Sequence, residues 1–302
     1  MRKLITVFGA SGNQGGGVVR ALVDDPGFEL RAVSRNPNSD KAARLRKFGV
    51  EVVQADYNDP ESLERALNGA YGCFVVTDTE WDTDDPLQLE LLHGQNVADA
   101  CKKQGVQHVV FSELLHVKKA IGISARHCDA KGHISDYMKQ IGLNKTGIII
   151  PFYFENLLTT MMPRKTGDNT FALGIPFGDK PMPGISAEDI GLVVGAFFRD
   201  SAAWGGKSLG VAGDIMLVND YAKVLSNNLG PKKFFDGQVT VQQVRDLQPY
   251  WPAAVDLANM YEFMMRASLP YSKDRTLKLC PAVRSFDQWV ADNRDKLDAA
   301  IN

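Results

Sequence analysis

The sequence is poor in the residues that build disulfide and metal sites. Its 302 residues include four cysteines, which form no Cys-x-x-Cys pair and lie far apart at Cys73, Cys101, Cys128 and Cys280. The five histidines are scattered as well. Disulfide-rich folds and zinc modules need clustered ligands of these two types. We therefore expect a protein with reduced thiols and no bound metal ion.

The chain also lacks an excess of charge and a long apolar run. Its 34 basic residues are balanced by 36 acidic ones, which gives no overall attraction to nucleic acid or to anionic membranes. No apolar run approaches membrane-spanning length, and no targeting sequence precedes the first predicted strand at Leu4. These absences predict a cytoplasmic protein, with the nucleus as a second location, and no direct nucleic-acid or membrane partner.

The first half of the chain alternates between strand and helix patterns. Strands are predicted over residues 4–8, 29–34, 50–54, 72–77, 108–112 and 147–150. Helices are predicted over residues 13–24, 40–48, 60–68, 86–104 and 128–140. This alternation predicts an α/β fold with a doubly wound parallel sheet of the Rossmann type, in which all strand C-termini share one edge.

The pattern changes after Pro151. Residues 163–186 are rich in proline and glycine and favour a β-hairpin, 207–211 resemble one more strand, and 219–302 are mainly helical. We predict a Rossmann domain and a smaller, mainly α C-terminal domain. The first covers residues 1–151 with a later contribution from about 186–222, and the second covers 152–185 and 223–302.

The most informative motif is a glycine triplet between the first predicted strand and helix. Gly9, Gly12 and Gly15 form Gly-x-x-Gly-x-x-Gly at this turn. Gly9 permits the tight turn, Gly12 lets a pyrophosphate approach the backbone, and Gly15 lets helix and strand pack closely. The alternative is a glycine-rich loop without a ligand. Because both flanking elements are present, the motif predicts dinucleotide binding.

The residue after the second strand indicates which dinucleotide is bound. An acidic residue there accepts the ribose 2′-hydroxyl of NAD, whereas this chain has Arg35-Asn36. A guanidinium can hold a 2′-phosphate by a bidentate contact, so we predict NADP(H). Ser39 and Lys41 are further phosphate candidates. The alternatives are a solvated surface arginine at position 35 and a solvated helix face at Lys41.

Other polar residues follow the later strands and should meet at the same sheet edge. Asp56 and Tyr57 are candidates for the adenine, although Asp56 could instead cap the next helix. Thr77, Asp78 and Thr79 border the expected ribose and nicotinamide position. Ser112 and the segment Tyr153, Phe154, Glu155 and Asn156 follow the fifth and sixth strands.

His127 and Lys131 are four residues apart and share one face of a helix. Lysine at this position could bond a nicotinamide ribose. The alternatives are a surface lysine and a helix-end histidine.

These motifs together resemble the NmrA-like family of atypical short-chain dehydrogenase/reductases, and in particular its animal redox-sensor type. The likeness runs over nearly the whole chain and is carried by residues 7–16 (VFGASGNQGG), 34–37 (SRNP), 66–71 (ALNGAY), 153–158 (YFENLL) and 256–260 (DLANM). The resemblance implies a cofactor site formed by Gly9, Ala10, Ser11, Gly12, Asn13, Gln14, Gly15, Arg35, Asn36, Ser39, Asp56, Tyr57, Thr77, Asp78, Thr79, Lys131, Tyr153, Phe154, Glu155 and Asn156.

The chain departs from the wider superfamily at the catalytic motif. None of its eight tyrosines precedes a lysine by four residues, so Tyr-x-x-x-Lys is missing. His127 stands at the tyrosine position, and a lysine beside it favours neutral imidazole, which is a poor acid. The resemblance thus implies a non-enzymatic NADP(H) sensor that changes conformation and protein partners, with a homodimer as one candidate assembly. The alternative is an NADPH-dependent reductase of a small carbonyl or quinone, with His127 or Tyr153 as proton donor.

Overall fold

The computed structural model describes residues 2–301 and divides into two units. Unit 1 comprises the chain up to His116, Arg126–Ile149 and Glu188–Leu209, and unit 2 comprises Val117–Ala125, Ile150–Ala187 and the chain from Gly210 on. The predicted first domain also contained 117–125, 150–151, 186–187 and 210–222, which here belong to unit 2. The domain boundaries themselves stay a prediction.

Unit 1 is built on a parallel sheet. Its strands are β1 (Lys3–Val7), β2 (Phe28–Ser34), β3 (Glu51–Gln54), β4 (Gly72–Val75), β5 (His108–Glu113) and β6 (Lys145–Ile149). They lie in the order β3-β2-β1-β4-β5-β6, and every neighbouring pair is parallel. This order confirms the doubly wound Rossmann arrangement. β11 (Ser208–Val211) comes next to β6, and β14 (Tyr271–Ser272) pairs with Gly210 and Val211 of β11.

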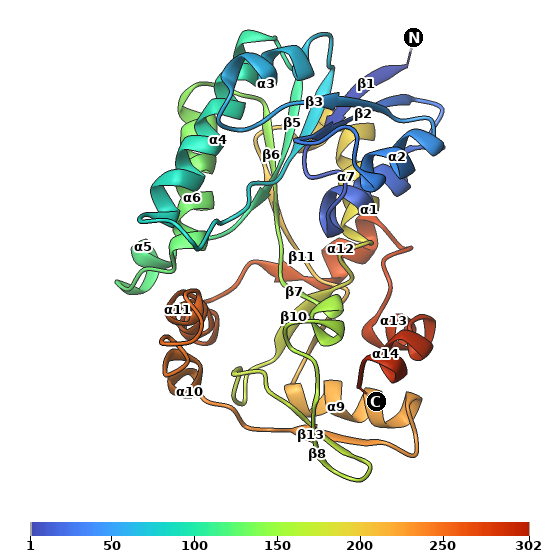
Figure 1. Ribbon diagram of the computed structural model, residues 1–302, viewed down its shortest axis with the longest axis vertical. Helices are drawn as coiled ribbons and strands as arrows, with labels where there is room; N and C mark the ends of the chain where they lie inside the picture. The colour runs from blue at the N-terminus through green and yellow to red at the C-terminus, as the bar shows by residue number, and fades with distance from the viewer. Residues whose placement is uncertain (1, 302) are drawn as a thin grey trace. The chain divides into compact units, whose positions relative to one another are not determined.

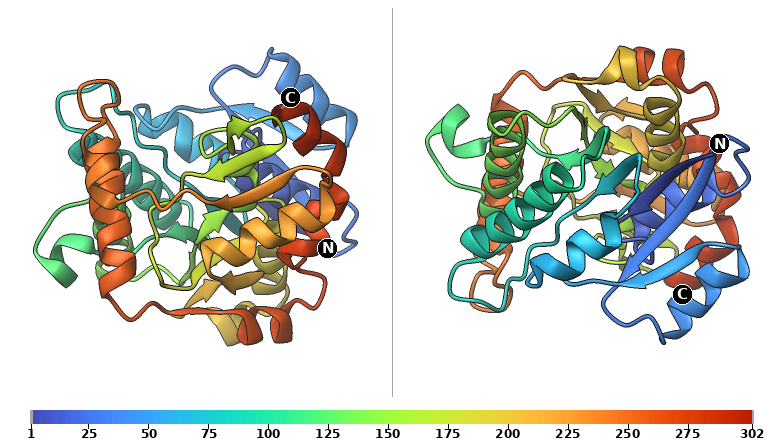
Figure 2. Two further views of the ribbon diagram at one scale, coloured as in Figure 1. Left: turned by 90° about the horizontal axis from the view of Figure 1, so that it is seen from below. Right: turned by 90° about the horizontal axis from the view of Figure 1, so that it is seen from above.

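Helices cover both faces of this sheet (Figures 1 and 2). The helices of unit 1 are α1 (Asn13–Leu22), α2 (Asp40–Lys47), α3 (Pro60–Leu67), α4 (Pro86–Lys103), α6 (Arg126–Gln140), α7 (Ile190–Arg199) and α8 (Ser201–Trp204). α4 packs between α3 and α6, whereas α1 packs against α7. Because both faces are covered, β4, β5 and β6 are buried at every residue. The strands and helices predicted for the first half are confirmed to within a few residues.

Unit 2 combines helices with two small sheets. Its helices are α5 (Val117–Ile121), the 3₁₀ helix η1 (Phe154–Leu158), α9 (Val218–Asn228), α10 (Val241–Arg245), α11 (Ala254–Arg266), α12 (Lys273–Leu279), α13 (Phe286–Asp292) and α14 (Arg294–Ile301). The sheets contain β7 (Phe152–Tyr153), β10 (Met182–Ile185) and β12 (Asp214–Met216), and β8 (Arg164–Gly167), β9 (Thr170–Leu173) and β13 (Lys233–Asp236). The predicted hairpin is present as β8–β9, whereas the mainly helical C-terminal segment also contributes β13 and β14.

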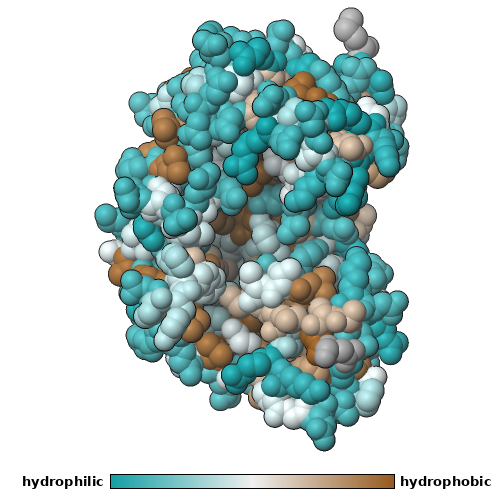
Figure 3. All heavy atoms as spheres, viewed as in Figure 1, coloured by the Kyte–Doolittle hydropathy of each residue, from teal (hydrophilic) through white to brown (hydrophobic). Residues whose placement is uncertain are grey.

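The two units have separate hydrophobic cores. In unit 1 the apolar faces of α3, α4 and α6 pack on the sheet around buried residues such as Val97 and Phe111. In unit 2 an aromatic cluster of Phe154, Tyr221, Phe286 and Trp289 holds η1, α9 and α13 together. The face shown in Figure 3 is mainly hydrophilic, with hydrophobic residues in scattered patches. Between residues 2 and 301, no helix combines the length and apolar character needed to cross a bilayer.

Candidate functional site

The glycine triplet forms a tight turn between β1 and α1. Gly9 has a φ of +62°, and its carbonyl oxygen accepts a hydrogen bond of 2.9 Å from the Gly12 amide. A Cβ at Gly15 would lie 2.3 Å from that same oxygen, so only glycine lets α1 start this close to the turn. A Cβ at Gly12 would lie 3.3 Å from it. The turn therefore presents bare backbone at its outer surface, as a pyrophosphate needs.

The start of α1 has the electrostatics of an anion site. Gly12 occupies the N-cap position, and the first turn carries no acidic side chain. The first amides of a helix have no intrahelical acceptor and lie at the positive end of the helix dipole. Ser11, Gly12 and Asn13 are exposed, and Ala10 is buried beneath them. The geometry fits a phosphate group at this position.

The turn lies where the strand order reverses. β1 and β4 are neighbours, with β2 and β3 following on one side and β5 and β6 on the other. In doubly wound sheets, ligands bind outside the C-terminal ends of the strands at such a point. Gly9 follows β1 and Thr77 follows β4. A Cβ at Gly9 would lie 2.7 Å from the Val76 side chain, so the two chain segments meet here. The residues that sequence analysis assigned to the diphosphate and to the ribose are therefore neighbours in space.

Arg35 lies directly after β2 and is exposed. Within residues 2–301 its guanidinium has no hydrogen-bond or ion-pair partner, so it is available to an anionic group. Asn36 is also exposed, and its side chain accepts a bond from the Asn38 amide. Ser39 caps α2 by accepting a bond from the Ala42 amide, which gives it a structural role. Lys41 is exposed on α2.

The two adenine candidates have structural partners. The Asp56 carboxylate accepts bonds from Asn58 and shapes the turn before α3, while Asp59 caps that helix. The Tyr57 ring stacks between Phe8 and His93, with ring centroids 5.6 Å apart on both sides. Its hydroxyl donates to the Val76 carbonyl over 2.8 Å, and burial raises the pKa of Tyr57. Tyr57 thus connects the loop after β3 to the chain segment after β4. Its contact with adenine stays a prediction.

A buried polar cluster lies at the end of β4. Lys131 of α6 donates to the Thr77 carbonyl over 2.7 Å and to the Thr77 hydroxyl oxygen over 3.0 Å. It also forms an ion pair with Glu90 of α4. The Glu90 carboxylate accepts bonds from the hydroxyls of Thr77 and Thr79. Asp78 lies on the exposed side of this loop, where its carboxylate accepts from the Thr79 amide.

Glu90 is the residue of this cluster that the sequence analysis missed. It is 1% exposed. Burial disfavours its charge, but the Lys131 ammonium and the two threonine hydroxyls hold the pKa of Glu90 below its ordinary value. The position of Glu90 in the helix pattern is a signal in the sequence that points to this role. Glu90 falls on the buried stripe of α4 with Pro86, Gly94 and Val97, where a carboxylate is unexpected without a partner.

His127 lies on α6, four residues before Lys131, as predicted. Its ring contacts the Trp81 ring edge-on, with centroids 5.6 Å apart. The Arg126 guanidinium lies 5.8 Å from the centroid of the same Trp81 ring. Trp81, which was not among the residues expected from the sequence, places a large aromatic surface beside His127.

Residues 153–156 belong to unit 2. Phe154 is fully buried in the aromatic cluster of that unit. The Glu155 carboxylate accepts bonds from the Ser186 hydroxyl, the Ala187 amide and the Trp289 indole. These contacts give Phe154 and Glu155 structural roles within unit 2. The assignment of Tyr153, Phe154, Glu155 and Asn156 to the cofactor site stays a prediction.

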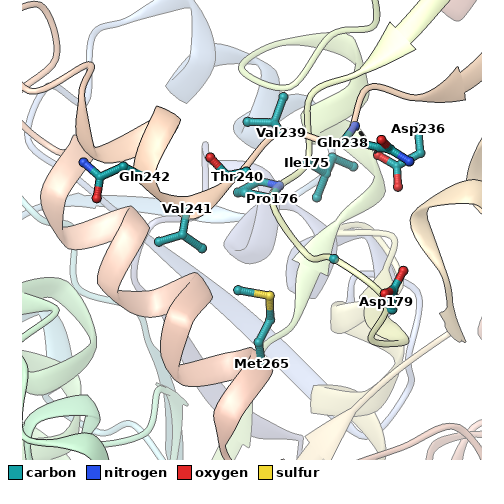
Figure 4. Close-up of a pocket in the computed structure, with 11 residues that line it drawn as sticks. Ile175, Pro176, Asp179, Asp236, Gln238, Val239, Thr240, Val241, Gln242 and Met265 are labelled. Atoms are coloured by element: carbon teal, nitrogen blue, oxygen red, sulfur yellow. Dashed lines mark hydrogen bonds between the residues drawn. The ribbon is translucent and has the colours of Figure 1, made fainter.

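Unit 2 also contains an open pocket of about 580 Å³ (Figure 4). It is lined by Ile175, Pro176, Gly178, Asp179, Asp236, Gln238, Val239, Thr240, Val241, Gln242 and Met265. The Gln238 amide donates to the Asp236 carboxylate over 2.8 Å at its rim (Figure 4). None of the residues selected from the sequence lines this pocket, so the candidate functional site stays with the glycine turn and the polar cluster of unit 1.

Replacing Glu90 by glutamine tests the buried ion pair. The substitution leaves the Lys131 ammonium buried without its counter-charge, so we expect the free energy of unfolding to fall by about 3–5 kcal/mol at neutral pH. The folded-state pKa of Glu90 lies below its ordinary value of 4.5. Its stabilising contribution is therefore present above that value and lost as the pH falls through the folded-state pKa. The difference between wild type and Glu90→Gln should shrink over the same range in urea titrations.

Glu64→Gln is the control, because Glu64 forms an ion pair with Lys103 in which the Lys103 side chain is 66% exposed. Exposed pairs contribute little to stability, so this variant should unfold like the wild type. Equal stability of Glu90→Gln and Glu64→Gln at neutral pH would show that the buried pair does not stabilise the fold.

A model of the NmrA-like family matches residues 1–297. An NmrA-like family domain-containing oxidoreductase of Aspergillus hancockii is 31% identical over 261 residues, which cover 77% of this chain and 74% of that protein.

Solved structures show the same fold. The structure of NmrA, a negative transcriptional regulator, in complex with NADP has a TM-score of 0.82 and 20% identity, covering 99% of this chain and 97% of that one. The triphenylmethane reductase of Citrobacter sp. complexed with NADP(H) has a TM-score of 0.76 and 20% identity, covering 98% and 99%. Because the family model extends over nearly the whole length, the chain belongs to the NmrA-like family.

Proposed function

We propose that this protein binds NADP(H) at the crevice between β1 and β4. The main support is the glycine turn, where a Cβ at Gly15 would clash with the Gly9 carbonyl and where α1 presents its amides without an acidic neighbour. The exposed Arg35 guanidinium supports the phosphorylated cofactor over NAD(H). The NADP-bound structures of NmrA and of the triphenylmethane reductase support the same proposal.

Different residues would bind different parts of the cofactor. The backbone of residues 9–14 would hold the diphosphate, and Arg35 with Asn36 would hold the 2′-phosphate. Thr77 and Lys131 would face the ribose near the nicotinamide. A bound NADPH supplies a hydride there. In this proposal Glu90 is a positioning residue, because it fixes the Lys131 side chain against Thr77.

Arg35→Asp tests the choice of cofactor. The variant replaces an attractive charge by a repulsive one at the 2′-phosphate, so we expect NADPH affinity to fall on the order of a hundredfold with little change for NADH. Calorimetric titration of the full chain with both cofactors measures the two affinities. Arg44→Asp makes the same charge change on the exposed face of α2 and should keep the wild-type preference. Wild-type protein that binds NADH and NADPH equally would contradict the proposal.

Within this role the protein acts as a sensor of the NADPH level, whose conformation and protein partners change with the cofactor. No tyrosine precedes Lys131 by four residues, and Lys131 itself is held by Glu90 and Thr77. The ordinary proton donor of the superfamily is therefore missing while the groups for cofactor binding are present. NmrA is a negative transcriptional regulator, which supports a regulatory role. The more specific likeness to the animal redox-sensor type stays a prediction.

A sensor must bind its ligand with different affinity in two conformations. We expect NADPH to protect residues 116–126 and 163–185 from hydrogen exchange, because the first segment directly precedes the helix of Lys131 and the second follows residues 153–156. Self-association, measured by sedimentation, should change with the cofactor as well. Arg35→Asp should lose this protection at the same NADPH concentration. Identical exchange and sedimentation with and without NADPH would leave a binding fold that has no sensor role.

A reductase is the second candidate, because the Aspergillus hancockii relative is named an oxidoreductase and Trp81 offers an aromatic surface beside His127. Here a small carbonyl or quinone would accept the hydride. The sensor proposal predicts negligible NADPH oxidation with panels of quinones and aldehydes, measured by absorbance at the nicotinamide band. Rapid turnover that is lost in His127→Ala, or in Tyr153→Phe, would favour the reductase and identify its proton donor.

A further inference from the structure

We infer that His116, His133 and Asp136 form a binding site for one divalent transition metal ion, of the class of Zn²⁺. One ligand atom from each side chain lies within 4.8 Å of the other two. The sequence gives no warning of this site, because His116 is 17 and 20 residues away from the other two. Only the fold brings them together, against the expectation that the scattered histidines bind no metal.

Two elements of unit 1 supply the ligands. His133 and Asp136 are three residues apart on α6 and share one exposed face of this helix. His116 follows β5 by three residues, and its Nε2 lies 2.9 Å from the Asp136 carboxylate. The His116 and His133 rings meet edge to face, with centroids 4.7 Å apart. Both imidazoles therefore lie beside the same carboxylate.

A glycine on α6 makes this approach possible. A Cβ at Gly132 would lie 2.7 Å from the His116 ring, so the ring rests directly on the helix at this residue. Gly132 precedes Asp136 by one helical turn and adjoins His133 in the chain. Any larger side chain would move the His116 ring away from both ligands of α6.

The ligand set determines the class of metal. Two imidazoles and one carboxylate suit Zn²⁺ and other divalent transition metals, whereas Mg²⁺ and Ca²⁺ prefer sites made of oxygen ligands alone. Three protein ligands leave one tetrahedral position for water. The site is separate from the cofactor residues of the same helix, because Lys131 is buried against Thr77 and Glu90 while His133 and Asp136 are exposed.

The test uses the full chain without an affinity tag, stripped with a chelator. Zn²⁺ binding is measured by competition with a chromophoric chelator, and Co²⁺ is used as a spectroscopic probe of the ligand geometry. We expect one Zn²⁺ per chain, a visible Co²⁺ band typical of a tetrahedral site, and no displacement by Mg²⁺. His116→Ala, His133→Ala and Asp136→Ala should each weaken binding by about tenfold or more and remove the Co²⁺ band.

His127→Ala is the matched control, since it removes one histidine from the same helix and should leave Zn²⁺ affinity unchanged. Circular dichroism in the presence of chelator checks that each variant is folded. His133 and Asp136 are exposed, so their variants keep the test valid even if His116→Ala does not fold. Undetectable Zn²⁺ binding to the wild type would overturn the inference. So would Zn²⁺ affinities of His133→Ala and Asp136→Ala that both equal the wild-type affinity.

Discussion

The buried ion pair between Glu90 and Lys131 constrains the candidate site more than any other interaction. Removing a carboxylate and an ammonium from water costs several kcal/mol for each ion, and this cost is offset only when the two charges meet and their remaining bonding capacity is filled. Thr77 and Thr79 fill it here, which ties α4, α6 and the end of β4 together. Unit 1 contains a second buried ion pair, in which the Lys145 Nζ lies 2.7 Å from the Glu113 carboxylate. The Ser135 hydroxyl accepts a bond from Lys145 and donates one to Glu113.

The order of the strands brings the glycine turn and the loop of Thr77 to the same edge of the sheet. β1 and β4 are neighbours, so the glycine turn and the Thr77 loop lie side by side although Val76 is 67 positions after Gly9 in the chain. A parallel sheet covered on both faces leaves only its strand ends open to ligands. In the proposed complex, the bare backbone of the turn and the exposed Arg35 would hold one extended anionic ligand.

Proteins with different roles share this fold. NmrA is a transcriptional regulator and the Citrobacter protein is a reductase, and both have the fold found here. The fold therefore does not decide between a sensor and an enzyme. In the function proposed here, the decision depends on the residues beside Lys131, where His127 lies four residues ahead of the lysine and the Trp81 ring contacts the His127 ring.

The sequence by itself determined strands β1 to β6, helices α1 to α4 and α6, the glycine turn and the position of Arg35, because local periodicity and glycine geometry need no distant partner. It also placed His127 and Lys131 on one helix. Tertiary structure alone decided that Glu90 is the partner of Lys131, that Tyr57 is stacked between Phe8 and His93, and that His116 meets His133 and Asp136. These contacts join elements far apart in the chain. Sequence spacing does not encode them, because they depend on which helix faces and strand ends the completed sheet brings together.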